Sequence, residues 1–83
     1  MNRDYVLYNL REAKEDLERT INELQSDPQY EYGDFVVAMS HLYLHINTAW
    51  NARNSTKTQS EECSEADFNR WRQFPDPVDL LLL

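Results

Sequence analysis

The sequence predicts an all-α fold, in which an antiparallel two-helix hairpin is followed by a short C-terminal helix. Apolar residues recur at helical spacing from about residue 4 to residue 25, and residues 35–52 carry no formally charged side chain. One glycine and three prolines divide the 83 residues into separate segments. Because the chain is too short for two domains, we expect a single helical domain over residues 1–83.

The first helix is expected at about residues 4–25 and is amphipathic. Its apolar residues fall on one helical face: Val6, Leu10, Ala13, Leu17, Ile21 and Leu24. Charged residues occupy the opposite face, as is typical of a helix with one solvated side. Ala13 and Thr20 lie between the leucines, so we expect a neighbouring helix to approach closely at this face.

A short connection, residues 26–34, separates this helix from the next. Pro28 cannot continue a helix, Gly33 permits a turn, and Asp34 is a suitable N-cap for the segment that follows. A loop of this length places its two helices side by side and antiparallel.

The second helix is expected at about residues 35–54 and is apolar around most of its circumference. Val37, Leu44 and Ala52 lie opposite the main apolar face, which includes Phe35 and Leu42. A helix of this kind is normally buried, and the first helix covers only one side of it. We therefore expect a second copy of the chain to cover the rest, giving a homodimeric four-helix-type bundle. The C-terminal segment is the alternative source of cover.

The only polar strip on the second helix is uncharged and consists of Ser40, Asn47, Asn51 and Asn54. Asparagine is a poor residue for the middle of a helix. Two interpretations remain open: a stripe that faces solvent, or hydrogen bonding across an interface.

The C-terminal third is expected to contain a polar linker, a short helix and an apolar tail. Residues 54–63 are rich in Ser and Thr, which indicates the linker. Ser64, with Asp67 three residues later, resembles a capping box and predicts a helix at about residues 65–74. Residues 75–83 end in four leucines, which we expect to pack on the chain or its dimer mate. Alternatively, they form an exposed end that binds another protein.

We expect the interface to be formed by three parts of the chain: the side of the second helix opposite its main apolar face, the aromatic residues of the short helix, and the tail. Its expected residues are Val37, Leu44, His41, His45, Trp50, Phe68, Trp71, Phe74, Leu80, Leu81, Leu82 and Leu83.

His41 and His45 lie four residues apart on one helix face, a spacing found in metal sites. Leu42 occupies the position where zinc proteases carry a glutamate, so the hydrolytic base of that class is missing. A site for zinc or another divalent metal would need further ligands, for which Asp34, Cys63 and a histidine of a dimer mate are the candidates. The preferred interpretation is that both histidines are partly buried and hydrogen-bonded to neighbours, or line a dimer interface, and no cofactor is predicted.

Catalysis receives little support from the sequence. The neighbouring Glu61, Glu62 and Glu65 disfavour the thiolate form of Cys63, so it is a poor nucleophile. The net charge of −7 argues against binding to nucleic acid or to an anionic membrane surface. We expect no enzymatic activity.

A cytoplasmic location is expected for two reasons. A lone cysteine suggests a reducing compartment. The chain also begins without a long apolar run behind basic residues, and no stretch is apolar enough to cross a bilayer. The sequence thus predicts a small cytosolic helical module for protein–protein interaction that self-associates. The alternative is a metal-binding or small enzyme domain that uses His41 and His45.

Overall fold

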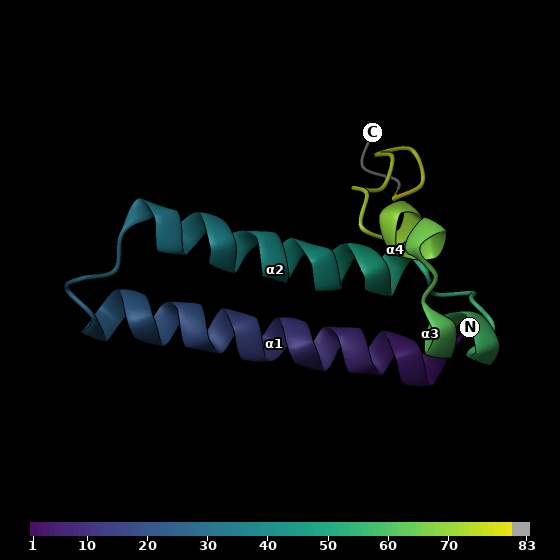
Figure 1. Cartoon of the computed structure of the whole chain (residues 1–83), viewed down its shortest axis with the longest axis horizontal. Coiled ribbons are helices and arrows are strands. Elements are labelled where there is room, and N and C mark those ends of the chain that lie inside the picture. Colours follow the sequence, from purple (N-terminus) through teal and green to yellow (C-terminus); the bar gives the residue numbers. More distant parts are fainter. Residues whose placement is uncertain (81–83) are drawn as a thin grey trace.

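The computed structural model describes residues 1–80, and every element in that range is a helix. Helices α1 (Arg3–Ser26) and α2 (Tyr32–Asn51) lie side by side and antiparallel along most of their length (Figure 1). The short helices α3 (Lys57–Glu62) and α4 (Glu65–Trp71) follow at the end where the chain begins. The expected helical hairpin is therefore confirmed. No helix in residues 1–80 has both the length and the apolar character needed to cross a bilayer.

Asn2 ties the start of α1 to the segment that follows α2. Its side-chain oxygen accepts a hydrogen bond from the Tyr5 backbone N–H at 3.2 Å, which caps the helix. Its side-chain amide donates to the hydroxyls of Ser55 and Ser60, both at 3.3 Å. The Asn2 backbone N–H also donates to the carbonyl of Arg53 at 2.6 Å. These contacts close the open end of the hairpin.

Helix α2 begins three residues earlier than expected and ends three residues earlier. Its N-cap is Glu31, and Asp34 lies within the first turn, where its carboxylate accepts a hydrogen bond from the Glu31 N–H at 2.9 Å. Asp34 thus caps the helix from inside the first turn and is not the N-cap itself. Gly33 is a helical residue, and the turn is formed instead around Asp27 and Pro28.

The expected linker at residues 54–63 contains helix α3, so that prediction is wrong for most of its length. Thr56 and Gln59 form a complete capping box: the Gln59 N–H donates to the Thr56 hydroxyl at 3.1 Å, and the Thr56 N–H donates to the Gln59 side-chain oxygen at 2.9 Å. Cys63 ends the helix in a left-handed conformation, with φ of 40°. The spacing of Thr56 and Gln59 in the sequence is the signal that predicts this start.

Helix α4 begins as expected, with the Ser64 hydroxyl accepting from the Asp67 N–H at 3.1 Å, but it ends at Trp71 and not near Phe74. Asn51 of α2 donates its side-chain amide to the carbonyls of Trp71 at 2.8 Å and Gln73 at 2.6 Å. These bonds satisfy carbonyls that a helix end leaves without partners. They hold α4 against the C-terminal end of α2, above that helix in Figure 1.

The polar strip of α2 therefore divides into two parts. Asn47 is buried and donates to the Arg72 carbonyl at 3.0 Å, beside the two bonds of Asn51. Ser40 and Asn54 are exposed. The two middle members of the strip, Asn47 and Asn51, form hydrogen bonds across a helix contact within the chain, whereas the two outer members face solvent.

Small and polar residues fill the contact between α1 and α2. The buried residues of α1 are Asn9, Ala13, Asp16 and Thr20. Ala49 and Ala52 are buried on the facing helix and its C-cap. Ala13 and Thr20 are buried in this contact, as the expected approach of a neighbouring helix requires. Leu10 and Leu17, on the same apolar face of α1, are each 47 % exposed beside it.

Candidate functional site

A row of large apolar side chains runs along one flank of α1, next to its contact with α2. Its members are Val6, Leu10, Leu17, Ile21 and Leu24. All except Val6 are exposed, with Leu24 the most open at 55 %. The row is displaced by about a quarter turn from the line of Asn9, Ala13, Asp16 and Thr20 that meets α2. It therefore forms a ridge beside the helix contact.

Helix α2 carries a matching row on the same side of the hairpin. Its members are Phe35, Met39, Leu42, Ile46 and Trp50. Ile46 and Trp50 share an apolar groove with Val6 and Leu10, which places the two rows on one side of the molecule. The ten side chains of the two rows include no charged group, and we refer to them together as the leucine face.

The groove, of about 390 Å³, lies at the end of the leucine face where the chain starts. Met1 lines it beside the helices, and the tail contributes Pro75 and Leu80. Leu80 is half-buried there, so the tail comes alongside the body of its own chain. The expected roles of Leu81, Leu82 and Leu83 lie outside the described residues.

The opposite flank of the hairpin is covered at this end by α4. Trp71 is only 3 % exposed and packs against Tyr5, with ring centroids 5.8 Å apart. Tyr5, His45, Cys63 and Trp71 are among the residues that line a small cavity of about 140 Å³. Burial, together with the neighbouring Cys63, raises the pKa of the Tyr5 hydroxyl above its usual value. Trp71 thus serves the docking of α4 and is not available to a partner.

The other residues expected at the interface are distributed over several surfaces. Val37 is 59 % exposed on the flank opposite the leucine face, and Leu44 is half-buried near α4. Phe68 is 38 % exposed. Phe74 is 69 % exposed and makes an edge contact with Tyr43 at 5.3 Å between ring centroids. Of the expected set on α2, Trp50 alone belongs to the leucine face.

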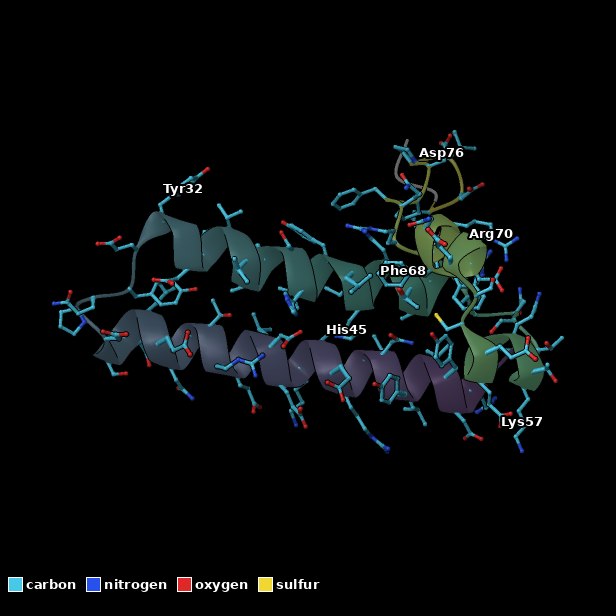
Figure 2. The ribbon with its side chains drawn as sticks, in the orientation of Figure 1. Tyr32, His45, Lys57, Phe68, Arg70 and Asp76 are labelled. Carbon is cyan, nitrogen blue, oxygen red and sulfur yellow. The ribbon has the colours of Figure 1, made fainter. Side chains whose placement is uncertain are left out.

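His45 points between the two long helices (Figure 2). Its Nδ1 atom lies 3.3 Å from the Asn9 side-chain oxygen, and its Nε2 atom lies 3.8 Å from Asp16 Oδ2. The other Asp16 oxygen accepts from the Arg19 guanidinium, whereas Oδ2 is buried and has no hydrogen-bond partner among the described residues. The expected partial burial and hydrogen bonding are therefore met by His45, but the expectation of partial burial is wrong for His41, which is exposed.

The structure separates the candidate metal ligands into two places. His41 is exposed and lines a groove with Asp34, whereas His45 and Cys63 line the small cavity beneath α4. Within residues 1–80, no three His, Cys, Asp or Glu side chains come together in a way that could hold a metal ion. The structure therefore offers no observation in favour of a metal centre at His41 and His45.

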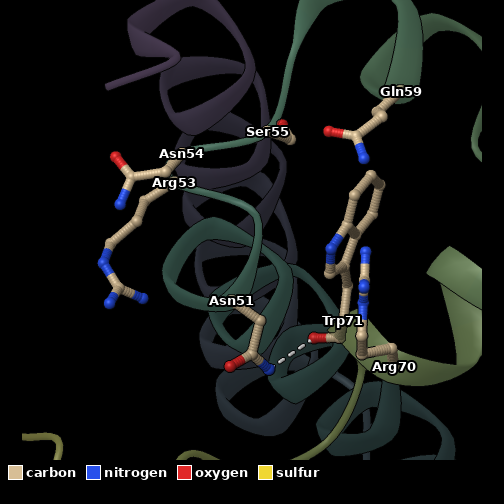
Figure 3. Close-up of a pocket in the computed structure, with 7 residues that line it drawn as sticks. All are labelled: Asn51, Arg53, Asn54, Ser55, Gln59, Arg70 and Trp71. Atoms are coloured by element: carbon tan, nitrogen blue, oxygen red, sulfur yellow. Dashed lines mark hydrogen bonds between the residues drawn. The ribbon is translucent and has the colours of Figure 1, made fainter.

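A more polar cavity, of about 440 Å³, lies between the end of α2 and α4 (Figure 3). Arg53 and Arg70 lie on opposite sides of it. Both guanidinium groups are already engaged: Arg53 lies 3.9 Å from the centre of the Trp50 ring, and Arg70 is paired with Asp67. Both arginines are thus partly engaged within the chain, and the leucine face, with its row of exposed apolar side chains, is the stronger candidate site.

The sequence contains the residues of the leucine face but does not show that they are uncovered. Leu10, Leu17 and Leu24 repeat every seven residues, which is equally compatible with a core and with an interface. The neighbouring row of Asn9, Ala13, Asp16 and Thr20 could have distinguished a core from an interface. Small residues permit the closest approach of another helix, so this row is the expected contact with α2.

No protein-family model, curated protein sequence or solved structure matches this chain.

Proposed function

We propose that this protein is a helical protein–protein interaction module that self-associates. The supporting observation is the composition of its core. Among the described residues, the buried apolar side chains are Ala13, Ala49, Ala52 and Trp71, and no large side chain is fully enclosed. A folded domain depends on burying large apolar groups, each of which contributes about 1.5–3 kcal/mol. A second subunit would supply the cover that the single chain lacks.

The low charge of α2 supports the same proposal. Its only charged residue is Asp34, in the first turn, and the helix is flanked by α1 on one side and by α4 at one end. The remaining surface of α2 displays Phe35, Val36 and Ile46, each 38–45 % exposed. Contiguous apolar surface of this kind usually marks an interaction site.

The proposal is tested by measuring the mass of the purified, folded chain at micromolar concentration, by sedimentation equilibrium. We expect twice the mass of one chain, which is 9.9 kDa. A helical sample with the mass of a single chain would contradict self-association.

We also propose that the module acts in a reducing compartment such as the cytoplasm. Cys63 is the only cysteine in the sequence, is half-buried, and has no disulfide partner within the chain. Labelling of the thiol in intact cells, before any exposure to oxidant, would show a reduced Cys63 if this proposal is correct.

A further inference from the structure

We propose that a second copy of this chain docks on the leucine face, so that the two faces meet across a two-fold axis. This proposal rests on the proposed self-association and identifies the surface that carries it. It differs from the surface expected from the sequence, which centred on Val37, Leu44 and the histidines.

The exposed area of the chain is large for its mass. A compact monomer of 9.9 kDa exposes about 5,200 Å² by the general scaling of surface with mass. This chain exposes 6384 Å², an excess of about 1,200 Å² over that scaling. A standard protein interface removes about 800 Å² from each partner. One interface of ordinary size would therefore remove about two thirds of this excess.

The leucine face has the composition of a surface that meets its own copy. It has no charged side chain, although the chain carries a net charge of −7. On the helical wheel of α1, the charged residues nearest to the face are Arg3 and Lys14, and Arg53 stacks on Trp50 at one end of the face. The face itself therefore brings no carboxylate into a contact between two acidic chains.

The length of the face also suits a second hairpin. It runs from Val6 to Leu24 along α1, roughly 27 Å at the rise of an α-helix, and over a similar length of α2. Face-to-face packing of two such hairpins gives four helices around one apolar core. In a two-fold contact the same surface of both subunits is buried, so the leucine face of each chain covers the leucine face of the other.

The opposite flank is less suited to this role. At one end α4 covers it, with Trp71 buried against Tyr5. At the other end Val37 and His41 share a groove with four charged side chains, in which three carboxylates outnumber one arginine: Asp16, Arg19, Glu23 and Asp34. A second copy docked there would bring like charges together, which is unfavourable.

The experiment compares Leu17→Lys on the leucine face with Val37→Lys on the opposite flank. The two positions are similarly exposed, at 47 % and 59 %, so each lysine reaches solvent in the single chain. We expect Leu17→Lys to weaken dimerisation by roughly tenfold or more, because it places a charge in the centre of the contact. Val37→Lys should leave the dimerisation constant within about twofold of the original chain. Sedimentation equilibrium measures both constants, and circular dichroism reports the helix content.

A second measurement covers the case in which Leu17→Lys also loses its helices. Nitroxide labels are attached at Leu17→Cys or at Val37→Cys, each in a Cys63→Ser background, and the distance between the two labels of the dimer is measured by pulsed electron resonance. The proposal requires the shorter distance for the label at position 17. A shorter distance for the label at position 37 would overturn it.

The possible failures are distinguishable. If the original chain is a folded monomer, self-association itself is wrong. If it is a dimer that Val37→Lys dissociates and Leu17→Lys does not, self-association stands and the leucine face is rejected as its surface.

Discussion

Asn9, Asp16 and His45 bring polar groups into the contact between α1 and α2. Asp16 is 7 % exposed, and burying a carboxylate is unfavourable unless it is paired. Arg19 and His45 lie against its two oxygens, and this partly offsets the cost. Such a contact holds two helices together more weakly than interdigitated leucines do. The consequence is a hairpin whose larger apolar residues remain available on its flank.

The hydroxyl of Tyr5 makes the stability of the fold decrease at alkaline pH. Burial raises its pKa in the folded chain above the value of about 10 found in an unfolded chain. The neutral hydroxyl therefore contributes stability that is fully present below pH about 10 and is lost as the pH rises through the folded-state pKa. We expect the melting temperature to fall above that pH. In Tyr5→Phe the fall should be smaller, and an unchanged fall would contradict the assignment.

The side-chain amide of Asn51 holds α4 through two carbonyls. Asn51→Ala should lower the free energy of unfolding by about 1 kcal/mol, because it removes hydrogen bonds to one half-buried and one exposed carbonyl. The fluorescence of Trp71 should shift to longer wavelength as α4 loosens. Asn54→Ala is the matched control, since Asn54 is exposed, and it should change stability by less than about 0.5 kcal/mol. Equal effects of the two substitutions would contradict this role for Asn51.

Metal should have little influence on the fold. Within residues 1–80 no third ligand joins His41 and Asp34, or His45 and Cys63. We expect the melting temperature to stay unchanged on addition of equimolar zinc and after treatment with a chelator. A rise with zinc that disappears in His41→Ala would restore the metal-binding alternative.

At the scale of the elements, local sequence signals account for most helix boundaries. The periodic apolar pattern predicted α1 within one residue at each end, because capping and periodicity agree there. Helix α3 has no apolar periodicity, and only its capping box marks it. The end of α4 depends on bonds from Asn47 and Asn51, which lie about twenty residues away in the sequence. Such long-range contacts are not visible in a local pattern.

The first turn of α2 offers a test of capping. Asp34→Ala removes the carboxylate that accepts from the Glu31 N–H and that interacts favourably with the helix dipole. We expect a loss of about 1 kcal/mol in the free energy of unfolding, measured with denaturant. Glu18→Ala is the control, because Glu18 lies exposed on α1 at 4.0 Å from Lys14, and it should cost less than about 0.5 kcal/mol. Loss of stability in the control alone would contradict the capping role.

At the scale of the whole molecule, the sequence predicted a helical hairpin, which the structure confirms, and a second helix that is apolar around most of its circumference. The sequence could not indicate which side of the hairpin remains open. On a helical wheel, the contact row of α1 and the leucine face lie about a quarter turn apart, and both fit an inward position. The choice between them depends on how Ala13, Asp16 and Thr20 pack against α2, which is a property of the folded pair.

The dependence of the melting temperature on protein concentration is the most direct test of the claim that the fold requires a second copy. For a chain that is folded only as a dimer, dilution favours the unfolded monomer by mass action. We therefore expect the melting temperature to rise steadily with concentration from the nanomolar to the high micromolar range. A melting temperature that is independent of concentration, in a sample that is helical throughout that range, would contradict the account.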